Sequence, residues 1–187
     1  MRRRAIWEIP GLPRTGWRLV DVLDTGPDST ARCDTCKTSL RYVHVLRHSE
    51  SLDPIHVGVR CAAHLTGDRH GPRTIEKALK RWQARRSTWL KQTNAAWRNS
   101  LSGRFELKLA KRKVTVLLRG GLYCYAVSNG RGPTPISRER FLTAEEASAH
   151  SFEILIPKPT VTQQHMPSQR DTCETAASDS REDESLT

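Results

Sequence analysis

The sequence has no long hydrophobic run. Its longest unbroken apolar stretch covers residues 122–127, whereas a helix that crosses a bilayer needs about 20 apolar residues. No apolar segment follows the basic start at residues 2–4, so we expect neither a membrane span nor a secretory signal. Hydrophobic residues make up 36% of the 187 residues, below the roughly 45–50% of typical globular domains, a figure that counts glycine. The composition therefore predicts small modules joined by polar connectors.

Acidic residues are also scarce over most of the chain. The sequence has 31 Lys and Arg against 20 Asp and Glu, a net charge of +11. Residues 160–187 hold two of the basic and six of the acidic residues, a net of −4, which leaves +15 for the rest. That end is rich in Ser, Thr and Gln, and it cannot bury enough apolar surface to offset the entropy of ordering. Residues 158–187 are therefore predicted to form a disordered acidic tail.

Periodicity predicts an α+β fold of small parts. A short strand is expected at 17–23, a hairpin at 41–48 and 55–60, and a three-stranded meander at 105–109, 113–118 and 122–127. Residues 74–99 lack Pro and Gly and repeat apolar residues at helical spacing, which predicts a long amphipathic helix. Thr143 and Glu146 match a capping box, so a short helix should cap the meander. The predicted divisions are an N-terminal arm and strand (1–30), a zinc module (31–72), a basic helix (73–103), a meander with helix (104–157) and the tail (158–187).

Two closely spaced pairs of metal-binding residues form the sharpest motif. Cys33 and Cys36 are separated by two residues, and so are Cys61 and His64, with 24 residues between the pairs. This spacing suits one tetrahedral Zn²⁺. A knuckle, a hairpin and then a short helix that begins at the second pair is the arrangement of a treble clef. Four protein ligands leave no open position on the metal, so the zinc is expected to be structural.

Other interpretations of these residues stay open. Cys33 and Cys36 could form a redox C-x-x-C motif with His64 a surface histidine, although no βαβ unit is visible around them. Histidines 44, 48, 56 and 70 compete with His64 for the fourth ligand position. His44 and His56 are expected to be ordinary cross-strand neighbours in the hairpin. Of the other cysteines, Cys124 is predicted to be a core residue and Cys173 a free thiol.

The segment from residue 33 to residue 64 resembles a loosely defined set of small bacterial, plasmid and phage proteins. The shared features are C-x-x-C, then R-Y-V-H, then V-G-x-x-C-A, which this chain carries at 33–36, 41–44 and 57–62. The resemblance implies a zinc treble clef and carries no catalytic residue across. The chain departs from the usual knuckle in having Lys37 where glycine normally follows the second cysteine.

The predicted helix and the start of the meander carry an unusual excess of positive charge. Residues 73–113 contain thirteen Lys and Arg against two Glu, a net of +11. A solvated helix face normally mixes signs so that ion pairs form along it. A polyanion would relieve the repulsion, which favours nucleic acid over an anionic membrane surface or an ordinary basic surface. The predicted contacts to phosphates come from six residues: Lys77, Lys80, Arg81, Arg85, Lys111 and Arg112.

The sequence therefore predicts a cytoplasmic, zinc-binding, non-enzymatic protein that binds DNA or RNA mainly through the phosphate backbone. It indicates no small-molecule substrate and no membrane partner. One alternative is a metal-dependent nuclease of the HNH type with His48 as general base. Such enzymes also need an Asn and a second His on the following helix, and residues 37–93 contain no Asn. Another alternative is a protein-interaction adaptor that uses the tryptophans of the helix, which otherwise pack in the core or stack on unpaired bases.

Overall fold

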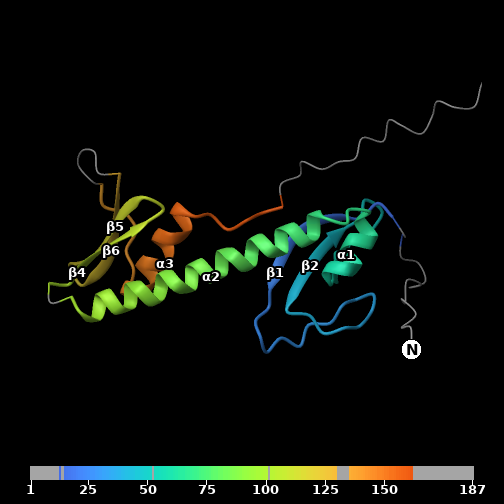
Figure 1. Ribbon diagram of the computed structural model, residues 1–187, viewed down its shortest axis with the longest axis horizontal. Coiled ribbons are helices and arrows are strands. Elements are labelled where there is room, and N and C mark those ends of the chain that lie inside the picture. Colours follow the sequence, from blue (N-terminus) through green and yellow to red (C-terminus); the bar gives the residue numbers. More distant parts are fainter. Residues whose placement is uncertain (1–12, 14, 52, 101, 130–134, 162–187) are drawn as a thin grey trace, which may run out of the picture.

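One long helix, α2 (Gly71–Arg98), runs past two separate β-sheets (Figure 1). The computed structural model describes residues 13, 15–51, 53–100, 102–129 and 135–161. Within them the chain forms a mixed α+β fold with two three-stranded antiparallel sheets and three helices. Helix α2 has 28 residues and is therefore about 42 Å long. This length lets it contact one sheet with its first half and the other with its second half.

The first sheet carries the cysteine motif. It consists of β1 (Arg18–Asp24), β2 (Tyr42–Arg47) and β3 (Ile55–Val57), and α1 (Val59–Thr66) follows directly. The expected hairpin of β2 and β3 forms, but its register differs from the expectation for the histidines. His44 pairs with Val57, and His56 pairs with Val45. The predicted cross-strand pairing of His44 with His56 is thus wrong by one position, which places the two side chains on opposite faces.

The second sheet is the predicted meander, formed by β4 (Arg104–Leu109), β5 (Arg112–Arg119) and β6 (Leu122–Ser128). Helix α3 (Ala144–Leu155) packs on it, and the predicted capping box is present. The Glu146 amide donates to Thr143 Oγ1 at 3.1 Å, and the Glu146 carboxylate accepts from the Thr143 amide at 3.2 Å. The capping residues therefore satisfy two backbone donors at the start of the helix.

Each sheet has its own hydrophobic core. The core beside the first sheet contains Trp17, Leu46, Val57, Ala62 and Leu65 together with two of the cysteines. The second core is larger and is closed by α2 and α3. Its buried members are Trp89, Phe105, Val114, Val116, Tyr125, Ala144, Ala147 and Phe152. The two cores share no buried residue, so α2 connects two packing units.

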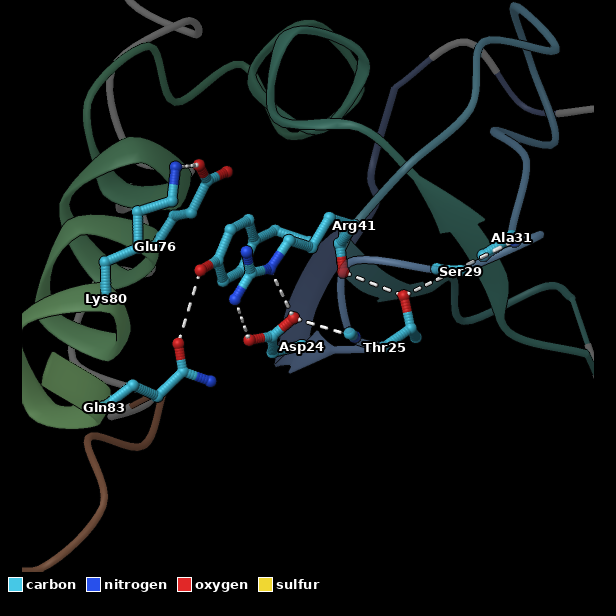
Figure 2. A network of polar contacts seen from close by, with 10 residues as sticks. Asp24, Thr25, Ser29, Ala31, Arg41, Glu76, Lys80 and Gln83 are labelled. Carbon is cyan, nitrogen blue, oxygen red and sulfur yellow. Dashed lines mark hydrogen bonds and ion pairs between the residues drawn. The ribbon is translucent and has the colours of Figure 1, made fainter. Parts of the chain in front are cut away.

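Polar contacts fasten the first sheet to α2 (Figure 2). The Tyr42 hydroxyl donates to Gln83 Oε1 at 3.3 Å, and Lys80 Nζ lies 4.4 Å from the centre of the Tyr42 ring. Arg41 donates two hydrogen bonds to the carboxylate of Asp24, at 3.0 and 3.1 Å. The first two contacts attach the helix to the sheet through a hydrogen bond and a cation–π contact, whereas the Arg41–Asp24 pair joins β1 to the residue before β2 within the sheet.

Both hairpin loops of the second sheet contain two residues with positive φ. Gly120 and Gly121, between β5 and β6, have φ of 60° and 80°, and the β4–β5 loop has Ala110 and Lys111 at 49° and 64°. Two-residue hairpin loops favour positive φ because it matches the twist of the strands, and glycine normally supplies it. The β4–β5 loop therefore holds two side chains in a conformation that costs each of them about 1–2 kcal/mol.

Some predictions fall outside the described residues. These are the first part of the N-terminal arm (1–12), Cys173 and the predicted acidic tail beyond residue 161. Cys124 is fully buried in β6, as predicted for a core residue. Among the described residues, none of the helices is both long enough and apolar enough to span a bilayer.

Candidate metal centre and basic helix face

Three cysteine sulfurs meet at the edge of the first core. The Sγ atoms of Cys33, Cys36 and Cys61 all lie within 4.8 Å of one another. Cys36 and Cys61 approach to 3.6 Å between sulfurs, and all three cysteines are free thiols. Cys33 and Cys61 are buried, whereas Cys36 is exposed. Among the described residues, this is the one cluster of three or more His, Cys, Asp or Glu side chains with metal-binding geometry.

A tight backbone turn brings Cys33 and Cys36 together. The Cys33 amide donates to the Thr38 carbonyl, and the Lys37 amide donates back to the Cys33 carbonyl, both at 2.9 Å. Lys37 takes the left-handed conformation with φ of 58°, which glycine adopts at lower cost. The knuckle thus closes without the usual glycine, and Lys37 carries the strain.

Hydrogen bonds hold this turn against the hairpin. The Asp34 amide donates to the His56 carbonyl at 2.8 Å, and the His56 amide donates to Asp34 Oδ2 at 2.6 Å. Cys61 arrives from the other side, in the first turn of α1, whose N-cap is Gly58. The partial positive charge of a helix N-terminus favours a thiolate at this position, but for Cys61 the hydrogen bond with Cys33 and burial outweigh this effect.

Shared hydrogen bonds shift the acidity of the buried sulfurs in opposite directions. The pKa of Cys33 is lowered, first because of its hydrogen-bonding interaction with the Cys61 thiol, and further because backbone N–H groups of Cys36 and Gly58 donate to its sulfur. The pKa of Cys61 is raised, because its proton is held by that hydrogen bond and because the group is buried. The hydrogen bonds that the Cys33 sulfur accepts thus offset the cost of burying its thiolate, even without a metal ion.

The donor set fits Zn²⁺. In a tetrahedral site with Zn–S bonds of about 2.3 Å, two sulfurs lie about 3.8 Å apart, close to the 3.6 Å between Cys36 and Cys61. Three thiolate ligands are typical of structural zinc sites of the Cys₃His type. Small concerted movements of side chains would bring all three sulfurs to bonding distance of one ion.

The predicted fourth ligand is not part of this cluster. His64 lies on an exposed part of α1, one turn beyond Cys61, and its ring nitrogens are not among the donor atoms gathered at the cysteines. Two of the competing histidines, 56 and 70, are also exposed, and none of the four competitors belongs to the cluster. The structure thus brings together three of the four predicted ligands.

His44 and His48 occupy unrelated surroundings. His44 is completely buried, and its Nε2 lies 3.2 Å from the Pro72 carbonyl at the start of α2. Burial lowers its pKa, so this histidine is neutral at pH 7. His48, the base of the nuclease alternative, packs against Trp17 at 5.3 Å between ring centres and accepts from the Glu50 amide at 3.1 Å.

A stripe of unpaired cations follows the exposed side of α2. The basic stripe comprises Arg73, Lys77, Arg81, Arg85, Lys91 and Arg98. At 100° per residue these six positions fall within an arc of about 140°, and they extend over about 38 Å of the helix. All six are exposed, and within the described parts of the chain none of them forms an ion pair.

The structure distributes the six predicted phosphate contacts unequally. Lys77, Arg81 and Arg85 belong to the basic stripe. Lys80 lies at its margin, because it is ion-paired with Glu76 and packs on the Tyr42 ring (Figure 2). Lys111 and Arg112 are exposed at the β4–β5 loop. The prediction omitted three stripe residues, Arg73, Lys91 and Arg98, although their helical spacing from the others was a usable signal.

The fold brings the β4–β5 hairpin alongside the basic stripe. A groove of about 310 Å³ lies between them, lined on the helix by Arg85 and on the strand by Lys108 and Leu109. Sequence spacing alone could not predict this, since the two cations are 23 positions apart. Their charges reach one surface because β4, which follows α2 in the chain, runs back along it.

The tryptophans of α2 face the second core. The indole of Trp89 donates to the Ser148 carbonyl at 2.9 Å, and that of Trp82 to the Ile156 carbonyl at 2.7 Å. Trp97 packs edge-on against Phe105 and Tyr123. These contacts satisfy the indole N–H groups of Trp82 and Trp89 and bury much of the apolar ring surface. The face that α2 presents to solvent is therefore basic, not aromatic.

In comparisons of the whole chain with protein-family models, curated proteins and solved structures, nothing matched, so the interpretation of these sites depends on their own geometry.

Proposed function

We propose that the chain is a zinc-binding, non-enzymatic nucleic-acid-binding protein that contacts mainly phosphates. The observation that carries the proposal is the basic stripe, six exposed cations on one helix face without an acidic partner in the described residues. Holding like charges in a row is unfavourable unless a polyanion neutralises them. A stripe of about 38 Å is about as long as one turn of duplex DNA, roughly 34–36 Å.

In this proposal the zinc is bound by Cys33, Cys36 and Cys61, with His64 as the fourth ligand. His64 is three residues beyond Cys61 on α1, and side chains at this spacing are neighbours on a helix. A change of its side-chain rotamer could thus bring it toward the sulfurs. The order of knuckle, hairpin and helix supports a treble clef and the family resemblance of residues 33–64. The zinc holds the first sheet and α1 together and performs no chemistry.

The test is the salt dependence of nucleic-acid binding. Each phosphate that a cation neutralises contributes about −0.9 to the slope of log K against log salt on duplex DNA, so four to six contacts predict a slope of about −4 to −5. The variant K77Q/R81Q/R85Q should bind more weakly to all sequences alike and should flatten the slope by about three units. Its zinc content should remain that of the parent.

A matched control has the same change in net charge elsewhere. The variant R18Q/R47Q/R138Q removes three exposed cations that are outside the basic stripe and form no ion pair in the described residues. It should keep the parental slope, because only charges near the phosphates release counterions. If both triple variants lose the same affinity, overall charge and not the stripe governs binding. If the parent does not bind DNA or RNA even at low salt, the proposal is wrong.

A further inference from the structure

The groove between α2 and the β4–β5 hairpin has the composition of a ligand site. Its lining includes the apolar side chains of Leu109, Trp89 and Phe152 and the polar side chains of Arg85, Gln92 and Lys108. Trp89 and Phe152 are almost completely buried, so Leu109 offers the accessible apolar surface. Arg85, Gln92 and Lys108 are exposed and are free to approach a ligand.

The charges of the groove select an anionic ligand. Its two cations come from different elements, α2 and β4, and its lining includes no acidic residue. Gln92 adds an amide that can both donate and accept hydrogen bonds. A fitting ligand therefore carries a negative group for Arg85 and Lys108, an apolar flat part for Leu109, and polar edges for Gln92. A nucleotide unit combines these three features.

The volume of the groove and its continuity with the basic stripe restrict the class of ligand further. About 310 Å³ is at the lower limit of ligand pockets, roughly 300–1,000 Å³, which suits a single ring system. Arg85 belongs to both the groove and the basic stripe, so a strand whose phosphates follow the stripe passes the mouth of the groove. The bases of a duplex are stacked inside and cannot enter, whereas an unpaired base can leave the strand, stack on the guanidinium of Arg85 and contact Leu109.

We infer that the groove receives an unpaired base of a single-stranded DNA or RNA whose phosphates lie on the basic stripe. This inference rests on the proposed function and adds a preference for single strands. The β4–β5 loop supports it, because Lys111 places an exposed cation in the two-residue loop that directly follows the groove residues Lys108 and Leu109.

The experiment compares a single-stranded DNA, the same strand with abasic sugars, its duplex and the RNA of the same sequence, all at one salt concentration. The abasic strand keeps every phosphate and lacks every base. The parent should bind the normal strand about fivefold more tightly than the abasic strand, which corresponds to the lower end of the range of about 1–3 kcal/mol that stacking of one base on an aromatic ring contributes. The ratio of RNA to DNA affinity then tells which sugar the site prefers.

Two exposed alanines of α2 provide matched variants. Ala84 lines the groove, and Ala95 lies outside it. A84W should fill the groove and abolish the preference for the normal over the abasic strand, while A95W should keep it. Neither should change the salt slope, because no charge is altered. T88W, at a second lining position, should act like A84W. Agreement of the two variants would show that the effect comes from filling the groove and not from misfolding of one variant.

The outcomes separate the inference from the proposed function. Equal binding of normal and abasic strands by the parent, or an unchanged preference in both A84W and T88W, would overturn the inference and leave phosphate binding intact. A parent that is a dimer and becomes monomeric in A84W would show that the groove is a subunit interface, which also overturns it. Absence of binding to any of the four nucleic acids would refute both proposals.

Discussion

Exchanging Lys111 and Gly121 between two hairpin loops should weaken nucleic-acid binding and leave the free energy of unfolding unchanged. Lys111 and Gly121 are the second residues of the β4–β5 and β5–β6 loops, and both have positive φ, 64° and 80°. The variant K111G relieves a left-handed lysine, which gains about 1–2 kcal/mol, and increases the entropy of the unfolded chain, which costs about 0.5–1 kcal/mol. The free energy of unfolding should therefore rise by about 0.5–1 kcal/mol.

The reverse change, G121K, should lower stability by a similar amount. A Cβ atom at Gly121 meets nothing within 4 Å, so the cost is conformational and involves no steric clash. The two loops lie at opposite ends of β5, which has eight residues and is about 26 Å long. Effects at such distant sites add, and the double variant K111G/G121K should have parental stability with an unchanged composition and net charge.

Binding should respond differently. The double variant moves one cation from the loop that follows the groove residues Lys108 and Leu109 to the loop at the other end of β5. Its affinity for single-stranded DNA should fall, and its salt slope should flatten by about 0.7–0.9. Urea unfolding followed by tryptophan fluorescence gives stability from the midpoint at constant m-value, and a fluorescence-anisotropy titration gives affinity. A lower midpoint for K111G would refute the conformational argument, and parental binding by the double variant would remove Lys111 from the interface.

Two further predictions concern the metal and an ion-pair network. C61S should lose the bound zinc, of which the parent should hold about one ion per chain, and it should unfold the first sheet with α1 while the β4–β6 unit stays folded. Metal analysis measures the zinc content, and near-UV circular dichroism measures the loss of tertiary structure. Full zinc content in C61S would contradict the proposed site. Glu106 accepts from Lys113 and Arg104, which lower its pKa to about 2. Its stabilisation is therefore complete above about pH 4.5 and is lost as the pH falls through about 2. Because the group is exposed, E106Q should cost at most about 1 kcal/mol at pH 7 and clearly less at pH 2, as measured by urea unfolding at both values.

Local signals predicted most of the elements in this chain. The period-2 patterns at 105–109, 113–118 and 122–127 correspond to β4, β5 and β6, and the capping residues Thr143 and Glu146 begin α3. The long helix begins earlier than predicted, at Gly71. The prediction started after Pro72, but proline is tolerated in the first turn of a helix because the amide it lacks has no partner there.

What the sequence could not supply is the pairing of distant segments. A shift of one residue in the register of β2 and β3 moves a side chain to the opposite face, which is why the expected His44–His56 pair was wrong. The cysteine cluster was predictable because the C-x-x-C knuckle is local and the remaining ligand follows a hairpin. The approach of Lys108 to Arg85 depends on how β4 packs along α2, and no local pattern encodes that packing.

The two packing units differ in how they reach stability, and this difference explains where a metal is useful. The second core contains four buried aromatic side chains, Trp89, Phe105, Tyr125 and Phe152, and further aromatics pack around it. The first sheet with α1 spans about 50 residues, and among its buried core residues Trp17 is the one large aromatic. Units of this size often need a metal or a disulfide in addition to apolar burial.

Cys33 and Cys61 are themselves part of that small core, so a zinc ion bound there would cross-link the knuckle, the hairpin and α1 where hydrophobic burial is weakest. Since α2 contacts this unit through Tyr42 and His44, we expect loss of the metal to loosen the attachment of the N-terminal half of α2 more than that of the C-terminal half, whose Trp89 packs in the second core.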